Sequence, residues 1–180
     1  MKLLLHVCCA PCAIHPFAEL RGREYKEITG FFYNPNIHPY TEFINRRKSL
    51  EEYSEKNKFP VVFHKYDMEN YFRHVAGHEG PGTRCPRCWR MRLEETASFG
   101  AQKDYDAFTT TLLVSPYQDQ EMIRKIGLEL SKKYRIDFFY RDLRDGFRKA
   151  QDAARKDNLY RQKYCGCVYS EKERYDKPAK

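Results

Sequence analysis

Five short apolar segments alternate with longer amphipathic segments along this chain. The apolar segments are rich in β-branched and aromatic residues and have the length of buried strands, over residues 2–7, 28–33, 61–63, 107–111 and 136–140. Between them, apolar residues recur every three or four positions, which predicts helices over 14–21, 41–57, 86–102, 119–134 and 146–158, and a short helix capped by Asp67. Strands that alternate with helices in this way indicate an α/β fold with a doubly wound parallel sheet of about five strands.

The predicted helix starts depend on a few polar and proline residues. Thr41 is placed to cap the second helix, and Pro16 falls in the first turn of the first one. Residues 77–84 are rich in glycine and proline, so we expect a loop there, with Pro86 at the first position of the helix that follows.

The predicted topology brings the ends of all five strands to one edge of the sheet, because parallel crossovers are right-handed. Ligands in open α/β sheets bind at that edge. It would carry the polar and thiol residues that follow the strands, namely Cys8, Tyr33, Asn34, Asp67, Thr110, Thr111 and Asp142.

Length and charge narrow the class of protein. The 180 residues suit a single catalytic domain over 1–170 with a polar tail over 171–180. The net charge of +8 favours an anionic partner, with nucleic acid the first candidate. No stretch approaches the roughly 20 apolar residues of a membrane span, and residues 3–7 are too few for a secretory signal. We therefore expect a cytoplasmic protein with no membrane partner, in a compartment where stable disulfides are rare.

Seven cysteines fall into three tight groups, which are Cys8, Cys9 and Cys12, then Cys85 and Cys88, then Cys165 and Cys167. Thiolates from three loops that meet at one sheet edge can hold an iron–sulfur cluster, which needs soft sulfur ligands. A structural zinc ion needs only four thiolates, and adjacent cysteines suit it poorly, but it stays the alternative. Packing as small apolar side chains accounts for one or two cysteines and not for seven.

Each group of cysteines has its own expected chemistry. Cys85 and Cys88 lie three residues apart at a predicted helix start, where the helix dipole favours thiolates. Cys165 and Cys167 flank a single glycine, so a disulfide between them would be strained and labile. A redox-active dithiol and metal ligation both remain open for this pair. Cys12 is explained equally well by packing and by ligation.

Several long motifs together resemble a known family. They are residues 6–12 (HVCCAPC), 30–40 (GFFYNPNIHPY), the Cys85-x-x-Cys88 pair, 109–112 (TTTL) and 160–167 (YRQKYCGC). Their combination resembles the QueH family of epoxyqueuosine reductases, over nearly the whole chain. That resemblance implies the last step of queuosine biosynthesis, in which the epoxide oxygen of epoxyqueuosine is removed at the wobble position of tRNA.

The resemblance also implies a fold and a cofactor. The family looks like an adenine-nucleotide-hydrolase-type, Rossmann-like fold. Carried over by motif, Cys8, Cys9, Cys85 and Cys88 would bind a 4Fe–4S cluster. Cys165 and Cys167 would be a redox-active pair or the ligands of an additional mononuclear iron, and Cys12 is a further candidate ligand.

The reaction also needs protons, electrons and a bound tRNA. Asp67, Asp142 and Tyr33, at predicted strand ends, are candidate proton donors. The chain has no nicotinamide or flavin fingerprint, so we expect an external electron donor. Cationic side chains beside the cysteines are candidates for tRNA phosphate contacts, namely Arg84, Arg87, Arg90, Arg161 and Lys163.

Two other functions are considered. An ATP-dependent tRNA-modifying enzyme of the same broad fold would need a glycine-rich phosphate loop after the first strand, where this chain has residues 8–12 (CCAPC) without a glycine. A zinc-stabilised RNA-binding module without catalysis would be colourless, whereas an iron–sulfur protein absorbs visible light.

Overall fold

The structure is a computed structural model and describes residues 1–21 and 25–176. Its centre is a five-stranded sheet in the order β3-β2-β1-β4-β5, in which every neighbouring pair is parallel. The strands are β1 (Lys2–His6), β2 (Glu27–Phe32), β3 (Val61–Phe63), β4 (Ala107–Thr110) and β5 (Asp137–Phe138). The predicted α/β class, the five strands and their parallel arrangement are confirmed.

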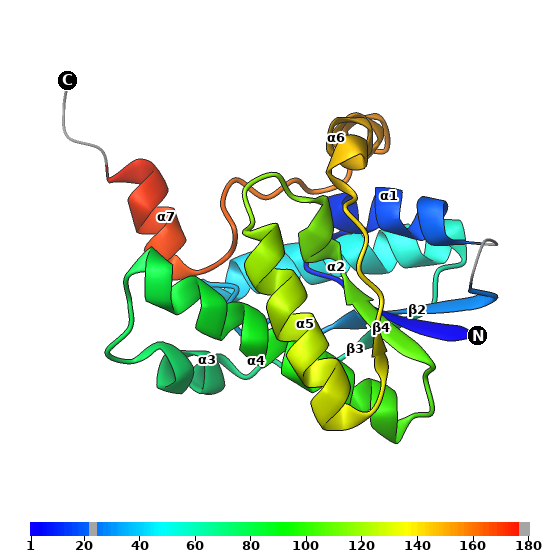
Figure 1. Ribbon diagram of the computed structural model, residues 1–180. Helices are drawn as coiled ribbons and strands as arrows, with labels where there is room; N and C mark the ends of the chain where they lie inside the picture. Colours follow the sequence, from blue (N-terminus) through cyan, green and yellow to red (C-terminus); the bar gives the residue numbers. More distant parts are fainter. Residues whose placement is uncertain (22–24, 177–180) are drawn as a thin grey trace.

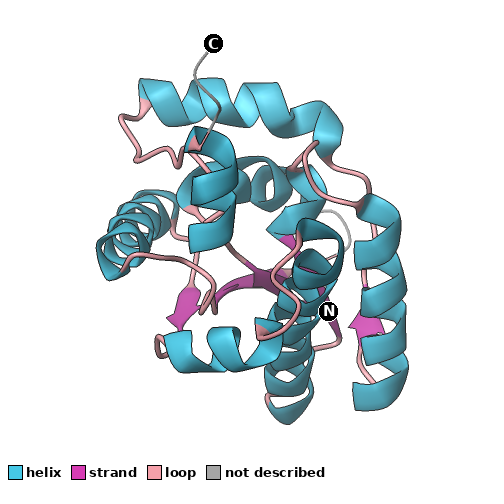
Figure 2. Ribbon diagram, turned by 90° about the vertical axis from the view of Figure 1, so that its left-hand side faces the viewer, coloured by secondary structure: helices cyan, strands magenta, loops and turns pink. Residues whose placement is uncertain are grey.

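Helices cover both faces of the sheet, as Figures 1 and 2 show. One face carries α1 (Ala10–Leu20), α2 (Tyr40–Asn57) and α6 (Phe147–Lys156). The other carries α3 (Met68–Val75), α4 (Pro81–Gln102) and α5 (Gln120–Tyr134). Two short 3-10 turns, η1 (Thr111–Val114) and η2 (Arg144–Gly146), and a last helix, α7 (Val168–Tyr175), complete the described part of the chain.

The central strand β1 explains the unbroken apolar run near the start of the sequence. Leu3 and Leu5 pack under α1 and α2, while Leu4 packs under α4 and α5, and all three are fully buried. Strands of a parallel sheet are covered on both faces, so they lack the alternation of a half-exposed strand. The strand order reverses direction at β1, and the crevice between the ends of β1 and β4 is the usual ligand site of such sheets.

Several predicted helix boundaries were wrong. Helix α4 begins at Pro81, so the expected loop over 77–84 is shorter and Pro86 lies inside the helix. Helix α1 begins at Ala10, with Pro11 in its first turn and Pro16 in its interior. In both cases the earlier of two prolines takes the start of the helix, where a missing N–H costs nothing.

The predicted caps gave mixed results. Asp67 caps α3 as predicted, and its carboxylate accepts a hydrogen bond from the Asn70 N–H at 3.1 Å. Pro39 rather than Thr41 precedes α2. The expected polar tail is helical as far as Tyr175, and residues 177–180 lie outside the described part. Among the described residues, no helix is long and apolar enough to cross a membrane.

Candidate functional site

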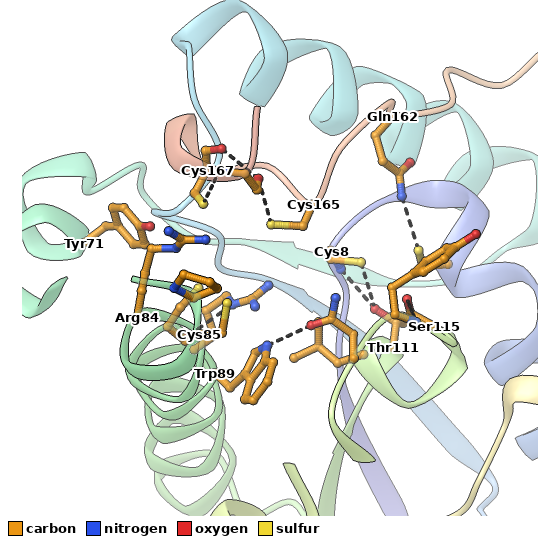
Figure 3. A pocket seen from close by; sticks show the side chains of 18 of the residues that line it. Cys8, Tyr71, Arg84, Cys85, Trp89, Thr111, Ser115, Gln162, Cys165 and Cys167 are labelled. Atoms are coloured by element: carbon orange, nitrogen blue, oxygen red, sulfur yellow. Dashed lines mark hydrogen bonds between the residues drawn. The ribbon is translucent and has the colours of Figure 1, made fainter. Parts of the chain in front are cut away.

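A pocket at the carboxyl edge of the sheet brings together residues from all parts of the chain (Figure 3). We call it the thiol pocket, because its walls include Cys8, Cys12, Cys85, Cys88, Cys165 and Cys167. The remaining wall is formed largely by α4, by residues 111–118 and by the start of α7. The seventh cysteine, Cys9, lies directly behind Cys8, with 3.7 Å between their sulfur atoms.

The end of strand β1 is fixed by a buried histidine. Burial lowers the pKa of His6 to about 4, so its imidazole is neutral. Its Nε2–H donates to the Tyr33 carbonyl at 3.2 Å, and its Nδ1 accepts from the Thr110 hydroxyl at 2.9 Å. The histidine thus joins β1 to the ends of both neighbouring strands. His6 is therefore a buried, hydrogen-bonded residue of the core.

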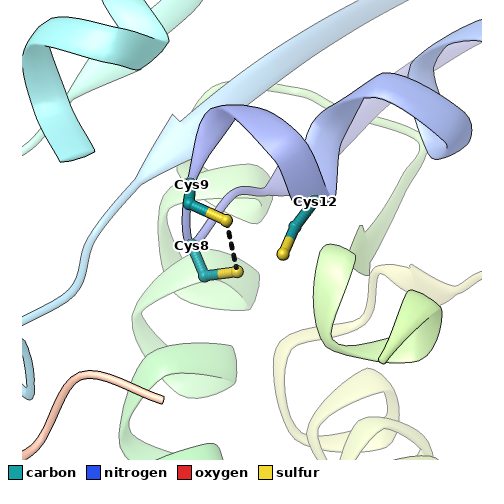
Figure 4. Close-up of side chains that lie close together, drawn as sticks. All are labelled: Cys8, Cys9 and Cys12. Carbon is teal, nitrogen blue, oxygen red and sulfur yellow. Dashed lines mark hydrogen bonds between the residues drawn. The ribbon is translucent and has the colours of Figure 1, made fainter. Parts of the chain in front are cut away.

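The turn after β1 gathers three sulfur atoms, as Figure 4 shows. Cys9 is the N-cap residue of α1 and Cys12 lies in its first turn, so the start of the helix directs both toward Cys8. The sulfur atoms of Cys8, Cys9 and Cys12 all lie within 4.8 Å of one another, and all three residues are buried. This is a spacing suited to holding a metal, and it brings Cys12 into the group.

The three cysteines of this turn differ in the direction in which their pKa values are shifted. Hydrogen bonds from Cys12 and Cys9 lower the pKa of Cys8 well below its ordinary value, and the Thr111 hydroxyl, which donates to its sulfur at 3.3 Å, adds to this. Burial raises the pKa of Cys9, and the hydrogen bond to Cys8 raises that of Cys12. The group therefore favours one thiolate, at Cys8, between two thiols.

Cys85 and Cys88 face the same pocket from α4. They lie beyond the first turn of this helix rather than at its start, because α4 begins at Pro81. Burial raises the pKa of Cys85 and raises that of Cys88 to about 11. The expectation that the helix start would favour thiolates here was wrong. Both side chains are therefore protonated thiols, Cys88 buried and Cys85 partly buried.

The third pair, Cys165 and Cys167, consists of one thiolate and one thiol. Cys167 is the N-cap residue of α7, and its sulfur accepts the Ser170 N–H at 3.3 Å. The hydrogen bond from Cys165, together with Ser170 and the Tyr71 hydroxyl, lowers the pKa of Cys167 to about 4. The same hydrogen bond raises the pKa of Cys165. No disulfide joins the two cysteines in this structure.

The backbone conformation and the close packing at position 166 require a glycine. Its φ of +135° is a conformation that side chains rarely adopt, and an added Cβ would lie 3.0 Å from Ile37 and 3.3 Å from Arg46 Nη1. Its carbonyl accepts the His38 N–H at 2.7 Å. The tight turn therefore seats the 165–167 segment on the 36–38 loop.

Arg46 of α2 is buried and holds the 165–167 segment in place. Its guanidinium donates to the carbonyls of Cys165 and Tyr164, both at 3.0 Å, and to the Glu42 carboxylate at 2.8 Å. It is 1% exposed and its charge also acts on Cys9. A basic residue inside an amphipathic helix gives no sequence signal for this role, and sequence reasoning missed it.

Two more buried guanidiniums line the thiol pocket. Arg84 makes a two-armed ion pair with Glu173 of α7, with both contacts at 2.9 Å, and lies over the Tyr169 ring. Arg92 donates to the Cys88 carbonyl at 3.3 Å. Arg46 and Arg84 are each paired with a carboxylate, whereas Arg92 contacts a backbone carbonyl.

Gln162 and Tyr71 are further pocket residues that sequence reasoning missed. The Gln162 amide donates to Cys9 at 2.9 Å and reaches Cys12 at 3.5 Å. Tyr71 is fully buried and its hydroxyl contacts Cys167. Gln162 lies within the 160–167 motif, so the sequence did contain a signal for it. Tyr71 occupies an ordinary apolar position of a short helix, which gives no such signal.

The three expected proton donors do not line the thiol pocket. Asp67 caps α3, and Tyr33 accepts a hydrogen bond from the Asn70 amide at 3.0 Å. Asp142 is exposed and pairs with Arg144 at 2.5 Å. Each is accounted for by these local contacts. The phenols in the pocket wall are instead Tyr71 and Tyr117.

The candidate tRNA-binding cations separate into two kinds. Arg84 is buried and committed to its ion pair, whereas Arg87, Arg90, Arg161 and Lys163 are exposed. Arg90 is paired with Glu129. Arg87 contacts the His78 ring at 2.9 Å. The exposed members keep the accessibility that phosphate contacts need.

The donor set fits a soft metal or an iron–sulfur cluster. Six thiols face one cavity, a seventh lies beside them, and buried cations balance the negative charge that bound thiolates would introduce. Hydrogen bonds to the sulfurs, such as those from Thr111 and Gln162, are among the contacts by which proteins tune such groups.

Comparisons with known proteins agree over almost the entire chain. The profile of one family, described as "Epoxyqueuosine reductase QueH", matches residues 3–173. Two curated proteins of that name are similar. The one from Dehalococcoides mccartyi is 36% identical over 178 residues, covering 98% of this chain and 96% of the relative. The one from Thermotoga maritima is 35% identical over 185 residues, covering 98% and 94%.

A solved structure shares the fold. The predicted subunit of a tRNA methyltransferase from Methanocaldococcus jannaschii superposes with a TM-score of 0.57 and 13% identity, covering 86% of this chain and 74% of that one. At this identity the likeness describes the architecture alone.

Proposed function

Because the chain belongs to the epoxyqueuosine reductase QueH family, whose members are oxidoreductases, we propose that it reduces epoxyqueuosine to queuosine at the wobble position of tRNA. The net change consumes two electrons and two protons, breaks both C–O bonds of the epoxide, forms the alkene and releases water. The observation that carries the proposal is the convergence of three distant cysteine groups on one pocket walled by buried cations.

We propose that Cys8, Cys9, Cys85 and Cys88 hold a 4Fe–4S cluster. Cys8 lines the pocket after the end of β1, with Cys9 directly behind it, and Cys85 and Cys88 line it from α4. Cys12, within 4.8 Å of Cys8 and Cys9, competes for the same role. When bound, the group supplies electrons and, at an iron with an open position, Lewis acidity. An external protein or small molecule must supply the electrons.

The residues around the thiols would bind the substrate and keep water out. Arg46 holds the 165–167 segment against the pocket, and the Arg84–Glu173 pair holds α7 beside it. Cys167 is kept as a thiolate and Cys165 as a thiol. Such a pair suits a redox-active dithiol, which would form an S–S bond with release of two electrons and one proton and would be reduced again by the external electron donor. An additional iron bound by this pair is the alternative for the same two sulfurs.

The test is the reaction itself. The full chain, prepared anaerobically and given a chemical reductant, should convert an anticodon stem-loop RNA that carries epoxyqueuosine into one that carries queuosine. Mass spectrometry of the nucleosides would show the loss of one oxygen atom. Protein that contains iron and sulfide but leaves the epoxide intact would refute the proposal.

A further inference from the structure

One aromatic ring on the rim of the thiol pocket is unusually exposed. Tyr117 lines the pocket, yet its side chain is 82% exposed, the highest value among the large apolar side chains of the described residues. Burying such a ring normally stabilises the folded state, so the fold forgoes that stabilisation here. A single exposed aromatic is ordinary on a protein surface, so it is the place of this ring, on the rim of the thiol pocket, that links it to a ligand.

The loop that carries the ring is held in place by hydrogen bonds. The Ser115 hydroxyl accepts the Tyr117 N–H at 3.3 Å, and the Ser115 carbonyl accepts the side-chain amide of Gln120 at 3.3 Å. The ring itself contacts Phe147 edge-on, with 6.0 Å between centroids. Because the side chain stays 82% exposed beside this contact, the ring offers a face to a planar ligand.

The next residue supplies an oriented hydrogen-bond donor. The indole N–H of Trp89 donates to Gln118 Oε1 at 2.8 Å, and this contact is one of the dashed lines of Figure 3. Because Trp89 occupies the Gln118 Oε1 atom, the NH₂ group of this amide is the part that can donate a hydrogen bond to a ligand. Gln118 lines the same pocket as Tyr117. A flat ring and an amide donor side by side are the groups that recognise an unpaired nucleobase, by stacking and by hydrogen bonding to its edge.

Charge on the adjoining surface matches a nucleic acid. Phe147, which contacts Tyr117, is the first residue of α6, and the next two residues, Arg148 and Lys149, are exposed cations. The chain as a whole carries a net charge of +8. Cations beside an exposed ring suit a ligand that joins a base to phosphates.

We propose that Tyr117 and Gln118 form a nucleobase subsite, in which an unpaired base of the anticodon loop stacks on Tyr117 while the neighbouring modified nucleoside enters the thiol pocket. The inference rests on the proposed tRNA substrate and deepens it. It assigns recognition of one base to stacking on the rim, separate from the phosphate contacts made by exposed arginines.

The test is a binding titration of an anticodon stem-loop RNA to the full, anaerobically prepared chain at several salt concentrations. Tyr117→Ala should weaken binding between about 5-fold and about 150-fold, the range for losing one base–aromatic stack. Tyr117→Phe keeps the ring and should bind like the wild type. The slope of affinity against salt should stay unchanged in both variants, because stacking releases no counterions.

Tyr175→Ala is the matched control, since Tyr175 is 56% exposed on α7 and does not line the pocket. If the wild type binds the RNA and Tyr117→Ala binds equally well, the stacking role is refuted while the proposed function stands. If the wild-type chain binds no stem-loop, the proposed function itself fails, and the subsite loses its ligand.

Discussion

At the scale of the residue, the same side chain takes opposite protonation states within one pocket. Burial raises the pKa of Cys88 to about 11, whereas hydrogen bonds at a helix N-cap lower that of Cys167 to about 4. The causes differ, because Cys88 is removed from solvent whereas Cys167 accepts hydrogen bonds. Replacing the two cysteines should therefore have different effects on iron content and on turnover.

Cys88→Ser removes a proposed ligand and should lose both the visible absorption of the cluster and epoxyqueuosine reduction. Cys167→Ser should lose turnover but keep most of its iron, because the 165–167 pair is assigned to redox chemistry. Iron analysis and an activity assay on anaerobically prepared variants separate the two. If Cys167→Ser is as colourless as Cys88→Ser, Cys167 is a cluster ligand and the assignment is wrong.

The sequence was enough to identify functional residues that form recognisable clusters. It was not enough to identify functional residues at ordinary positions of amphipathic helices. The cysteine groups are visible as clusters, and their convergence follows from the α/β topology. Arg46 and Tyr71 look like ordinary positions of amphipathic helices, and only the folded chain brings them to the thiols. Asp67 was recognised correctly as a cap, and this same role keeps its carboxylate engaged away from the pocket.

At the scale of the element, the end of β4 is held by one hydroxyl. Thr110 bonds to His6 and also accepts the Leu112 N–H at 3.1 Å, so it joins β4 to β1 and starts η1. Thr110→Val leaves these two buried groups without their partner. The free energy of unfolding should fall by about 1–3 kcal/mol, measured by urea denaturation.

Thr109 provides the control on the same strand. Its hydroxyl is buried and has no hydrogen-bond partner among the described residues. Thr109→Val should therefore leave the stability unchanged or raise it slightly, since no bond is lost. Equal losses of stability in both variants would show that the strand tolerates valine poorly. The His6–Thr110 contact would then contribute nothing to the free energy of unfolding.

Helix α7 is attached to the pocket by an ion pair and by the partly buried Tyr169 ring, which packs against the core. It has no buried residue of its own, and Glu173 binds the buried guanidinium of Arg84 with both carboxylate oxygens. Glu173→Gln should speed amide hydrogen exchange over residues 168–175 by roughly tenfold, the equivalent of about 1.4 kcal/mol from a weakened charge-assisted contact that is partly screened by solvent.

The matched control for this helix is Asp176→Asn. Asp176 forms an exposed pair with Lys172 at 3.8 Å within the same segment, and such surface pairs contribute little. Exchange over residues 168–175 should stay at the wild-type rate in that variant. Unchanged exchange in Glu173→Gln would mean that α7 is held by other contacts.

At the scale of the whole molecule, the architecture was the most predictable feature and the helix starts the least. Five apolar runs separated by helical patterns specify a parallel sheet, because both faces of each strand must be covered. The start of α4 was misplaced by five residues, since Pro81 and Pro86 both suit a first turn and local sequence does not choose between them.

The positive charge of the molecule leads to a prediction for RNA binding. Arg87→Ala should weaken binding of tRNA several-fold and lower the salt slope by about one, as expected when one phosphate contact is lost. Arg90→Ala should have a smaller effect, because Glu129 already neutralises Arg90. Titrations over a range of salt concentrations measure both. Equal affinities and slopes in all three proteins would mean that these arginines only face solvent.

The central claim is that thiols from two distant segments, Cys8 with Cys9 and Cys85 with Cys88, hold one iron–sulfur cluster. The most direct measurement is iron, acid-labile sulfide and zinc per chain in anaerobically purified protein, with Cys85→Ser as the comparison. The wild type should contain about four irons and about four sulfides, with broad visible absorption that Cys85→Ser loses. A colourless wild-type protein with stoichiometric zinc and no sulfide would contradict the claim.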